Sequence, residues 1–274
     1  MAIADVGLFL TTTGITDPER ACATARELGF RLVQLGKLPD TYYSPEGARL
    51  LDGILLRNEL ECVALCMVYD GESYSDLDAV RRTVGFVPEE TVAARVAQSR
   101  RCVDTAADLG VPLVTTHVGL IPSDPGDPAY RRVRDAVEDI AAHSQKRGVR
   151  LALETGQETA QELLDLIDSA GAPVGVNFDG ANFVAYSTQD PVEALHLLYD
   201  RTASVHVKDY LPPPASGRFI RECPLGQGAA RVDETIRYLV DHRFPGPLIL
   251  EQYDRQNPLQ TIAESRAYVM GLVS

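Results

Sequence analysis

The sequence predicts an α/β protein, a closed (β/α)8 TIM barrel that forms one catalytic domain over residues 1–274. Eight short runs rich in β-branched and apolar residues alternate with longer segments of helical period, and eight such units close a parallel barrel. The length of 274 residues is normal for one barrel. The first strand-to-helix turn, LTTTGITDP, contains no GxGxxG motif, which disfavours a doubly wound open sheet built from the same units.

The strand-like runs are short, apolar and bounded by turn residues, as buried parallel strands are. They occupy residues 4–10, 31–37, 61–69, 112–119, 150–156, 173–179, 203–210 and 247–253. In a barrel their carboxyl ends meet at one face, where the connecting loops form the active site. Two of those loops are long, 70–86 and 210–231, and we expect them to cover the site.

The segments between the strands carry signals for the start and end of helices. Asp17, Ser44 and Asp127 are each followed by proline, the arrangement of an N-cap and a first helical residue. Gly110 and Gly148 end two of the helical patterns. The expected helices span 17–30, 44–60, 87–110, 127–148, 159–170, 190–200, 232–242 and 257–273.

Composition and charge limit the classes of function. The net charge of −13 opposes contact with phosphodiester backbones, so we expect no nucleic-acid partner. Five cysteines without a CxxC pair are typical of reduced thiols. No apolar run approaches the roughly 20 residues of a membrane helix, and MAIADVGLFL lacks the basic start of a signal peptide. These observations predict a cytoplasmic protein without membrane contact.

Ligand-type side chains stand near the ends of the last four predicted strands, which carry in order Glu154, Asp179, His206 and Glu251. In a barrel these residues converge on one pocket. Carboxylates that lie so close raise one another's pKa unless a cation lies among them. A divalent ion would coordinate the three carboxylates and the imidazole, and this ligand set suits Mn²⁺, Mg²⁺ or Co²⁺.

Other polar residues near the strand ends are weaker candidates. His117 ends the fourth predicted strand, where it could contact a substrate or support the metal ligands. If His206 points into the pocket, Lys208 shares its face of the strand and Asp209 faces the helices. The remaining histidines lie in or near predicted helices, where satisfied surface side chains are the simpler interpretation; they are His143, His196 and His242.

Two features of the loops bear on anionic ligands. PLGQG (224–228) is rich in glycine but too short and wrongly placed for a phosphate-binding loop. Arg218, Arg221 and Arg255 could bind an anionic group, although solvated loop arginines are the simpler interpretation. No Ser/His/Asp or Cys/His arrangement for a nucleophile can be singled out.

The motifs at the strand ends resemble those of the sugar phosphate isomerase/epimerase superfamily, the xylose-isomerase-like TIM barrels, over nearly the whole chain. They are LALETG (151–156), VNFDGANF (176–183), SVHVKD (204–209), PLGQG (224–228) and GPLILEQY (246–253), with TTHVG (115–119) as a further match. The resemblance implies Mn²⁺ or Mg²⁺ at Glu154, Asp179, His206 and Glu251, with Co²⁺ or Zn²⁺ as further candidates. It also implies that Glu154 and Glu251 are the catalytic acid–base pair, which acts through a metal-stabilised enediolate.

We therefore expect a divalent-metal-dependent isomerase or epimerase that removes an α-proton from a small polyhydroxy carbonyl compound, a keto-sugar or sugar phosphate. The residues expected to contact this carbohydrate are His117, Asn182, Lys208 and Glu222. An isomerase or epimerase of this kind could also form a homo-oligomer.

Two departures from the epimerase pattern keep other functions open. Asn182 stands where these epimerases often have histidine, and Pro212 stands where they place an arginine. The alternatives are a metal-dependent lyase or dehydratase, acting by β-elimination on a keto-sugar, keto-glycoside or inosose, and a non-catalytic sugar-binding barrel. The extra histidines of the related DNA-repair endonucleases are missing, which argues against DNA repair.

Overall fold

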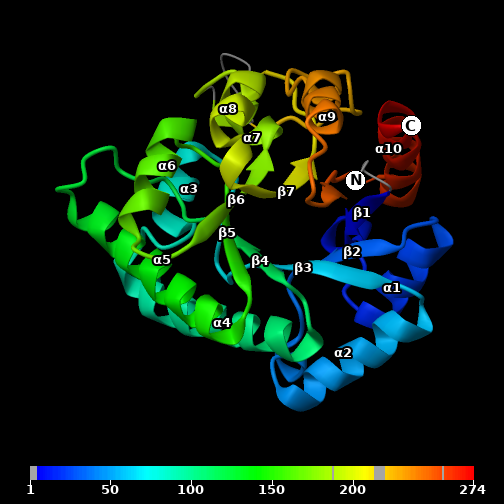
Figure 1. The fold of residues 1–274 in the computed structure, drawn as a ribbon, viewed down its shortest axis with the longest axis horizontal. Helices are drawn as coiled ribbons and strands as arrows, with labels where there is room; N and C mark the ends of the chain where they lie inside the picture. The colour runs from blue at the N-terminus through cyan, green and yellow to red at the C-terminus, as the bar shows by residue number, and fades with distance from the viewer. Residues whose placement is uncertain (1–4, 187, 213–219, 255) are drawn as a thin grey trace.

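The computed structural model describes residues 5–186, 188–212, 220–254 and 256–274, whose strands form a closed parallel barrel (Figure 1). The strands are β1 (Val6–Phe9), β2 (Leu32–Leu35), β3 (Glu61–Met67), β4 (Leu113–Thr116), β5 (Arg150–Glu154), β6 (Val174–Asp179), β7 (Thr202–Val207) and β8 (Leu248–Leu250). Each strand pairs with the next, and β8 pairs with β1 to close the ring. The predicted fold class is confirmed. Residue 4 of the first predicted strand and residues 213–219 of the second long loop lie outside the described residues.

Helices pack around the outside of the ring, as Figure 1 shows for α4 and α5 beside β4 and β5. The eight predicted helices are present as α1 (Pro18–Glu27), α2 (Pro45–Arg57), α4 (Glu89–Leu109), α5 (Pro128–Arg147), α6 (Ala160–Ser169), α8 (Pro191–Leu198), α9 (Val232–Asp241) and α10 (Pro258–Val273). The side chains of Asp17, Ser44 and Asp127 cap their helices as expected. Gly110 and Gly148 end theirs with φ of 71° and 72°.

The structure adds elements that the sequence patterns did not predict. The loop 70–86 contains a helix, α3 (Leu77–Thr83), and a second helix, α7 (Gly180–Tyr186), begins directly after β6. Three short 3₁₀ turns are η1 (Leu10–Thr13), η2 (Asp40–Tyr42) and η3 (Tyr199–Arg201). Since α3 and α7 follow strands at the carboxyl ends, both lie on the face of the barrel that carries the predicted site.

The loop after β3 is fastened to α4. The buried guanidinium of Arg95 donates hydrogen bonds to the carbonyl oxygens of Gly85 (2.5 Å) and Thr83 (2.7 Å). Gly85 has φ of 65°, and a β-carbon there would overlap the backbone of Val118. Glycine is therefore required where the loop passes the end of β4.

A layer of small and apolar side chains fills the inside of the barrel beneath the site. Ala64, Leu113, Ala152 and Ala203 form one buried cluster. Ala152 and Glu154 are two residues apart on β5 and therefore share a face of the strand, so Glu154 lies one layer closer to the carboxyl end. The described helices include none long and apolar enough to cross a membrane, and all five cysteines are free.

Candidate metal centre

The side chains of Glu154, Asp179, His206 and Glu251 converge at the carboxyl ends of the last four strands. One ligand atom from each lies within 4.8 Å of the others, and all four residues are buried. β5, β6 and β7 carry the first three residues, and Glu251 follows β8 directly. Parallel pairing places them side by side, since Asp179 is in register with His206 and Glu154 is in register with the residue two before Asp179. The predicted ligand set thus comes together in space.

The hydrogen bonds of His206 determine which ring nitrogen faces the cluster. Gln34 Nε2 donates to Thr115 Oγ1 at 3.0 Å, which leaves Gln34 Oε1 as the acceptor for His206 Nε2 at 2.7 Å. His206 Nε2 therefore carries the hydrogen in the neutral ring, and Nδ1 presents a lone pair to Glu251 Oε2 at 2.6 Å. Two acceptor atoms this close require a proton or a metal ion between them. This geometry fits a metal-binding histidine with its outer partner already in place.

The carboxylates around His206 favour the protonated form of its ring. Burial alone lowers the pKa of His206, but the carboxylates of Glu154 and Glu251 outweigh it and raise that pKa to about 10. Asp179 Oδ2, His206 Nδ1 and Glu251 Oε2 form no well-aligned hydrogen bond within the described chain. Buried oxygen and nitrogen atoms that lie within 4.8 Å of one another fit a divalent cation with oxygen and nitrogen ligands.

Glu154 receives more hydrogen-bond donors than the other carboxylates. Asn177 Nδ2 lies 3.3 Å from its Oε2, and Asn182 Nδ2 lies 3.4 Å from its Oε1. His117 Nε2 lies 3.1 Å from the same Oε1. Burial raises the pKa of Glu154, but His117 and His206 outweigh burial and lower it well below its usual range. His117 and Asn182, both expected at the substrate, therefore also orient this carboxylate.

Lys208 bridges the other two carboxylates. Its Nζ lies 2.9 Å from Asp179 Oδ2 and 2.8 Å from Glu251 Oε2. Burial raises the pKa of Glu251, but the Lys208 ammonium and the His206 ring together outweigh burial and lower that pKa below its usual value. Lys208 and Asp209 point to different sides of the strand, as the alternation predicts. Lys208 faces the carboxylate cluster, whereas Asp209 faces away from it and accepts N–H groups from residues 226, 228 and 230 of the following loop. PLGQG is thus folded around the chain's own carboxylate.

A cavity of about 1090 Å³ opens above the cluster. Its wall includes all four side chains expected to contact a substrate, His117, Asn182, Lys208 and Glu222. Aromatic rings make up much of the rest, from Phe9, Tyr74, Tyr186, Tyr210 and Tyr253. Apolar ring faces beside a few convergent polar groups are typical of small-molecule sites.

Several polar residues of the site were missed by the sequence analysis. Gln34 and Asn177 are buried in strand interiors, Glu72 comes from the loop after β3, and Glu158 lies just before α6. Gln34 had a signal, since it is the one polar residue in the strand LVQL. The predicted surface histidines behave as expected, with His143 Nε2 2.9 Å from Asp104 Oδ1. Arg218 and Arg255 lie outside the described residues.

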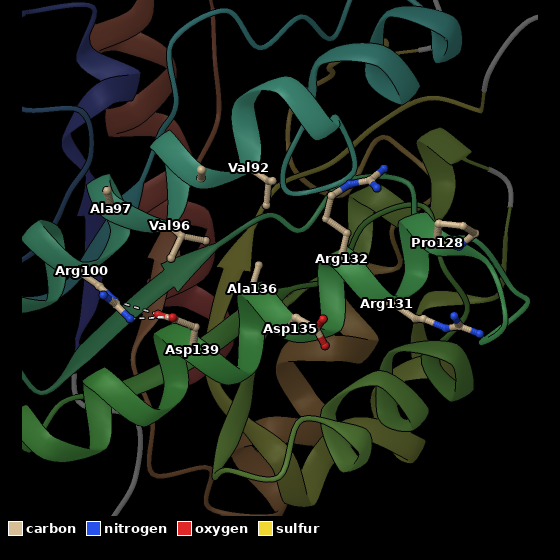
Figure 2. A pocket seen from close by; sticks show the side chains of 11 residues that line it. Val92, Val96, Ala97, Arg100, Pro128, Arg131, Arg132, Asp135, Ala136 and Asp139 are labelled. Carbon is tan, nitrogen blue, oxygen red and sulfur yellow. Dashed lines mark hydrogen bonds and ion pairs between the residues drawn. The ribbon is translucent and has the colours of Figure 1, made fainter.

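A second hollow lies on the outside of the barrel, between α4 and α5 (Figure 2). It has a volume of about 640 Å³ and an apolar floor that includes Val92, Val96 and Ala136. Arg100 closes one end through hydrogen bonds of 2.7 and 2.6 Å to the carboxylate of Asp139. It shares no residue with the cavity above the cluster.

Comparisons with known proteins place the chain in a family. Residues 22–270 match the family described as xylose isomerase-like TIM barrel, and the chain belongs to it. A xylose isomerase domain protein from Planctomyces limnophilus is 31% identical, with 91% of this chain and 90% of that chain covered and a TM-score of 0.86. The predicted family resemblance is confirmed. No curated protein gives a significant match.

More distant solved structures share the fold. A xylose isomerase-like TIM barrel protein from Mycobacterium smegmatis, in complex with magnesium, is 19% identical over 98% of this chain and 96% of that chain, with a TM-score of 0.74. D-psicose 3-epimerase with D-tagatose, from Clostridium cellulolyticum H10, is 14% identical over 98% of this chain and 99% of that chain, with a TM-score of 0.73.

Proposed function

We propose that this protein is a divalent-metal-dependent isomerase or epimerase of a small polyhydroxy carbonyl compound. The observation that carries the proposal is the buried cluster of Glu154, Asp179, His206 and Glu251, in which the Nδ1 atom of His206 faces carboxylate oxygens. A sugar-binding barrel without chemistry has no use for two glutamates at the same ion. The magnesium complex and the epimerase with D-tagatose described above support the class of ion and of substrate.

Mn²⁺ or Mg²⁺ is the ion that this ligand set suits best. When bound, the ion would supply positive charge to the carbonyl and neighbouring hydroxyl oxygens of the substrate, which lowers the barrier to loss of the adjacent carbon-bound proton. Glu154, Asp179, His206 and Glu251 would hold it. Since Lys208 Nζ already lies 2.8–2.9 Å from two of these carboxylates, its ammonium would shift toward the cavity and the substrate.

The proton transfers are assigned to the two glutamates. In an epimerisation one carboxylate takes the α-proton, and the electron pair of the broken C–H bond moves to the carbonyl oxygen. The other glutamate, which begins as the protonated acid, then gives its proton to the opposite face of that carbon as the electron pair returns from the oxygen, and the carbon is inverted. Glu154 and Glu251 come from β5 and the end of β8, three strands apart in the ring, so they reach the substrate from different sides. His117 and Asn182 would fix the orientation of Glu154.

A β-elimination would begin with the same proton removal, and Lys208 supports it as a second candidate. Its buried ammonium lies beside Glu251 and is placed to protonate a departing oxygen. The product then contains a new carbon–carbon double bond, and water is lost.

Hydrogen–deuterium exchange distinguishes these reactions. The metal-loaded protein is incubated in D₂O with a panel of ketoses and keto-sugars, and the products are followed by NMR. We expect deuterium at the carbon next to the carbonyl together with the epimeric sugar, whereas a dehydrated product would assign the elimination. Elemental analysis should find about one divalent ion per chain, as one set of ligands requires. A protein that takes up neither Mn²⁺ nor Mg²⁺, and exchanges no proton, would contradict the proposal.

A further inference from the structure

Carboxylates outside the cluster line the cavity above it. Glu72, Glu222 and Asp254 are all part of the wall. Glu72 Oε1 accepts the N–H of Gly85 at 2.8 Å, and Glu222 Oε2 accepts the N–H of Tyr253 at 2.6 Å. Each carboxyl group is therefore held at the wall by a backbone donor, Glu72 within the loop after β3 and Glu222 by the segment after β8. The proposed chemistry uses neither residue.

The cationic side chains of the wall already have partners. Apart from the imidazole of His117, the described lining residues include the cations Lys208 and Arg221. Lys208 is shared between Asp179 and Glu251, and Arg221 donates to a backbone carbonyl at 3.3 Å. The described wall thus has more negative than positive side chains.

The backbone donors that bind phosphate in many barrels are also occupied. Phosphate sites of this fold use the loops after the seventh and eighth strands and the amino end of a helix, where N–H groups point at the anion. Here Asp209 accepts three N–H groups within 226–230, at 2.9–3.0 Å. Asp254 accepts those of residues 256 and 257, before α10, at 2.7 and 3.1 Å. The chain's own carboxylates take the positions that a phosphate would need.

We propose that the substrate of this site is an uncharged keto-sugar, carrying neither a phosphate nor a carboxylate, and that Glu72 and Glu222 enforce this preference. The inference rests on the proposed function, because it names the substrate class of the same site. A phosphate brings a charge of about −1.5 to −2, which the carboxylates of the wall repel. The hydroxyl groups of a neutral sugar instead donate hydrogen bonds to those carboxylates.

Matched pairs of sugars test the preference. Calorimetry on the metal-loaded protein measures the affinity for D-tagatose and D-tagatose 6-phosphate, and for D-fructose and D-fructose 6-phosphate, with inorganic phosphate alone as a further probe. We expect each neutral sugar to bind at least about tenfold more tightly than its phosphate at low salt, a gap that narrows as salt screens the charges. Inorganic phosphate should not compete with the neutral sugar.

Two variants test whether the glutamates set the preference. Glu72→Gln and Glu222→Gln keep an oxygen to accept the loop N–H but remove the charge. Each variant should bind the neutral sugar more weakly. Each should also reduce the ratio of the affinities for the neutral and the phosphorylated sugar about tenfold. A residue that only holds its loop would weaken both sugars alike. The control is Glu27→Gln, at the exposed end of α1 on the opposite face of the barrel, which should leave the gap unchanged.

The outcomes separate this inference from the proposed function. Neutral sugars that bind with the expected preference but exchange no proton in D₂O would refute the chemistry and leave the substrate class standing. Tighter binding of the phosphorylated sugars would overturn the substrate class and point to Arg218 and Arg255 as anion ligands. Failure of every neutral sugar to bind, or an unchanged gap in both variants, would also overturn it.

Discussion

Gln34 and His206 show how one polar contact inside the barrel can orient a proposed metal ligand. They are 172 residues apart in the chain, yet Gln34 Oε1 lies 2.7 Å from His206 Nε2. No local pattern pairs two such residues, because the contact crosses the ring from β2 to β7. The strand-end positions of the proposed ligands could be predicted from the sequence, since the barrel brings all strand ends to one face. The partners that orient these ligands could not.

Replacing Gln34 with leucine should weaken metal binding. The variant Gln34→Leu removes the acceptor for His206 Nε2–H, so the ring can turn or take up the other tautomer. Outer partners of metal-binding histidines typically contribute 10–100-fold to metal affinity, and we expect a loss of about that size in a calorimetric titration with Mn²⁺. Gln98→Leu is the matched control, because Gln98 donates to the Val68 carbonyl outside the cluster. Equal affinities in the two variants would refute this role of Gln34.

Removing either proposed base should abolish most of the turnover. Glu154→Gln and Glu251→Gln keep the side-chain shape and one oxygen ligand. General acid–base groups contribute about 10²–10⁴-fold in rate, and each variant should lose at least the lower value at saturating metal. One variant should still exchange deuterium from one face without completing inversion. Near wild-type turnover by both, with metal bound, would make His117 or Lys208 the next base to examine.

At the level of an element, the alternation of side chains along strand β7 and its continuation determines which residues face the site. Its continuation turns Lys208 into the cavity and Asp209 outward, so successive residues serve the site and the loop that follows. Period-two alternation made this predictable from the sequence. α7 was not predictable, because every residue from Gly180 to Ala185 is buried and the helix has no amphipathic pattern. α3 was missed because seven residues are too few to show a period clearly.

Asp209 should be needed for the order of the loop after β7. Asp209→Ala leaves three backbone N–H groups without their acceptor. The buried N–H of Ala230 then costs about 1–3 kcal/mol, whereas those of Gly226 and Gly228 are partly exposed to water and cost less. We expect the free energy of unfolding to fall by about 2–4 kcal/mol and the amides of 226–230 to exchange faster with solvent. Asp209→Asn should lose less, since it keeps one acceptor oxygen. The exposed Asp241 supplies the control, Asp241→Ala. Unchanged amide exchange in Asp209→Ala would contradict this function.

At the scale of the whole molecule, buried acids connect stability to pH. Burial raises the pKa of Glu158 to about 7, whereas in an unfolded chain it is about 4.3. Between these values the folded protein holds a proton that the unfolded chain has released. The stability that this carboxyl group contributes is therefore complete below about pH 4.3 and is lost as the pH rises to about 7, by about 3 kcal/mol in all.

The variant Glu158→Gln should remove this dependence. Glutamine is uncharged at every pH, so the variant should lose less stability than the wild type between pH 5 and pH 8 and should be the more stable protein at pH 8. Urea unfolding of metal-loaded protein at both pH values measures the difference. The control is Glu27→Gln, at an exposed position far from the cavity. A variant with the full wild-type loss between the two pH values would show that Glu158 is not the titrating group.

The ring closes between its first and last strands, where β1 pairs with β8 through Val6 and Leu248. Glu251 follows β8 by one residue and is in place only when that strand has docked. A ribosome must therefore deliver nearly the whole chain before the fourth ligand reaches the other three. During synthesis the partial barrel presents an incomplete set of the proposed ligands, so uptake of the proposed ion would belong to the final stage of folding. Cutting the chain before residue 247 would consequently remove both the strand that closes the ring and the fourth residue of the proposed metal site.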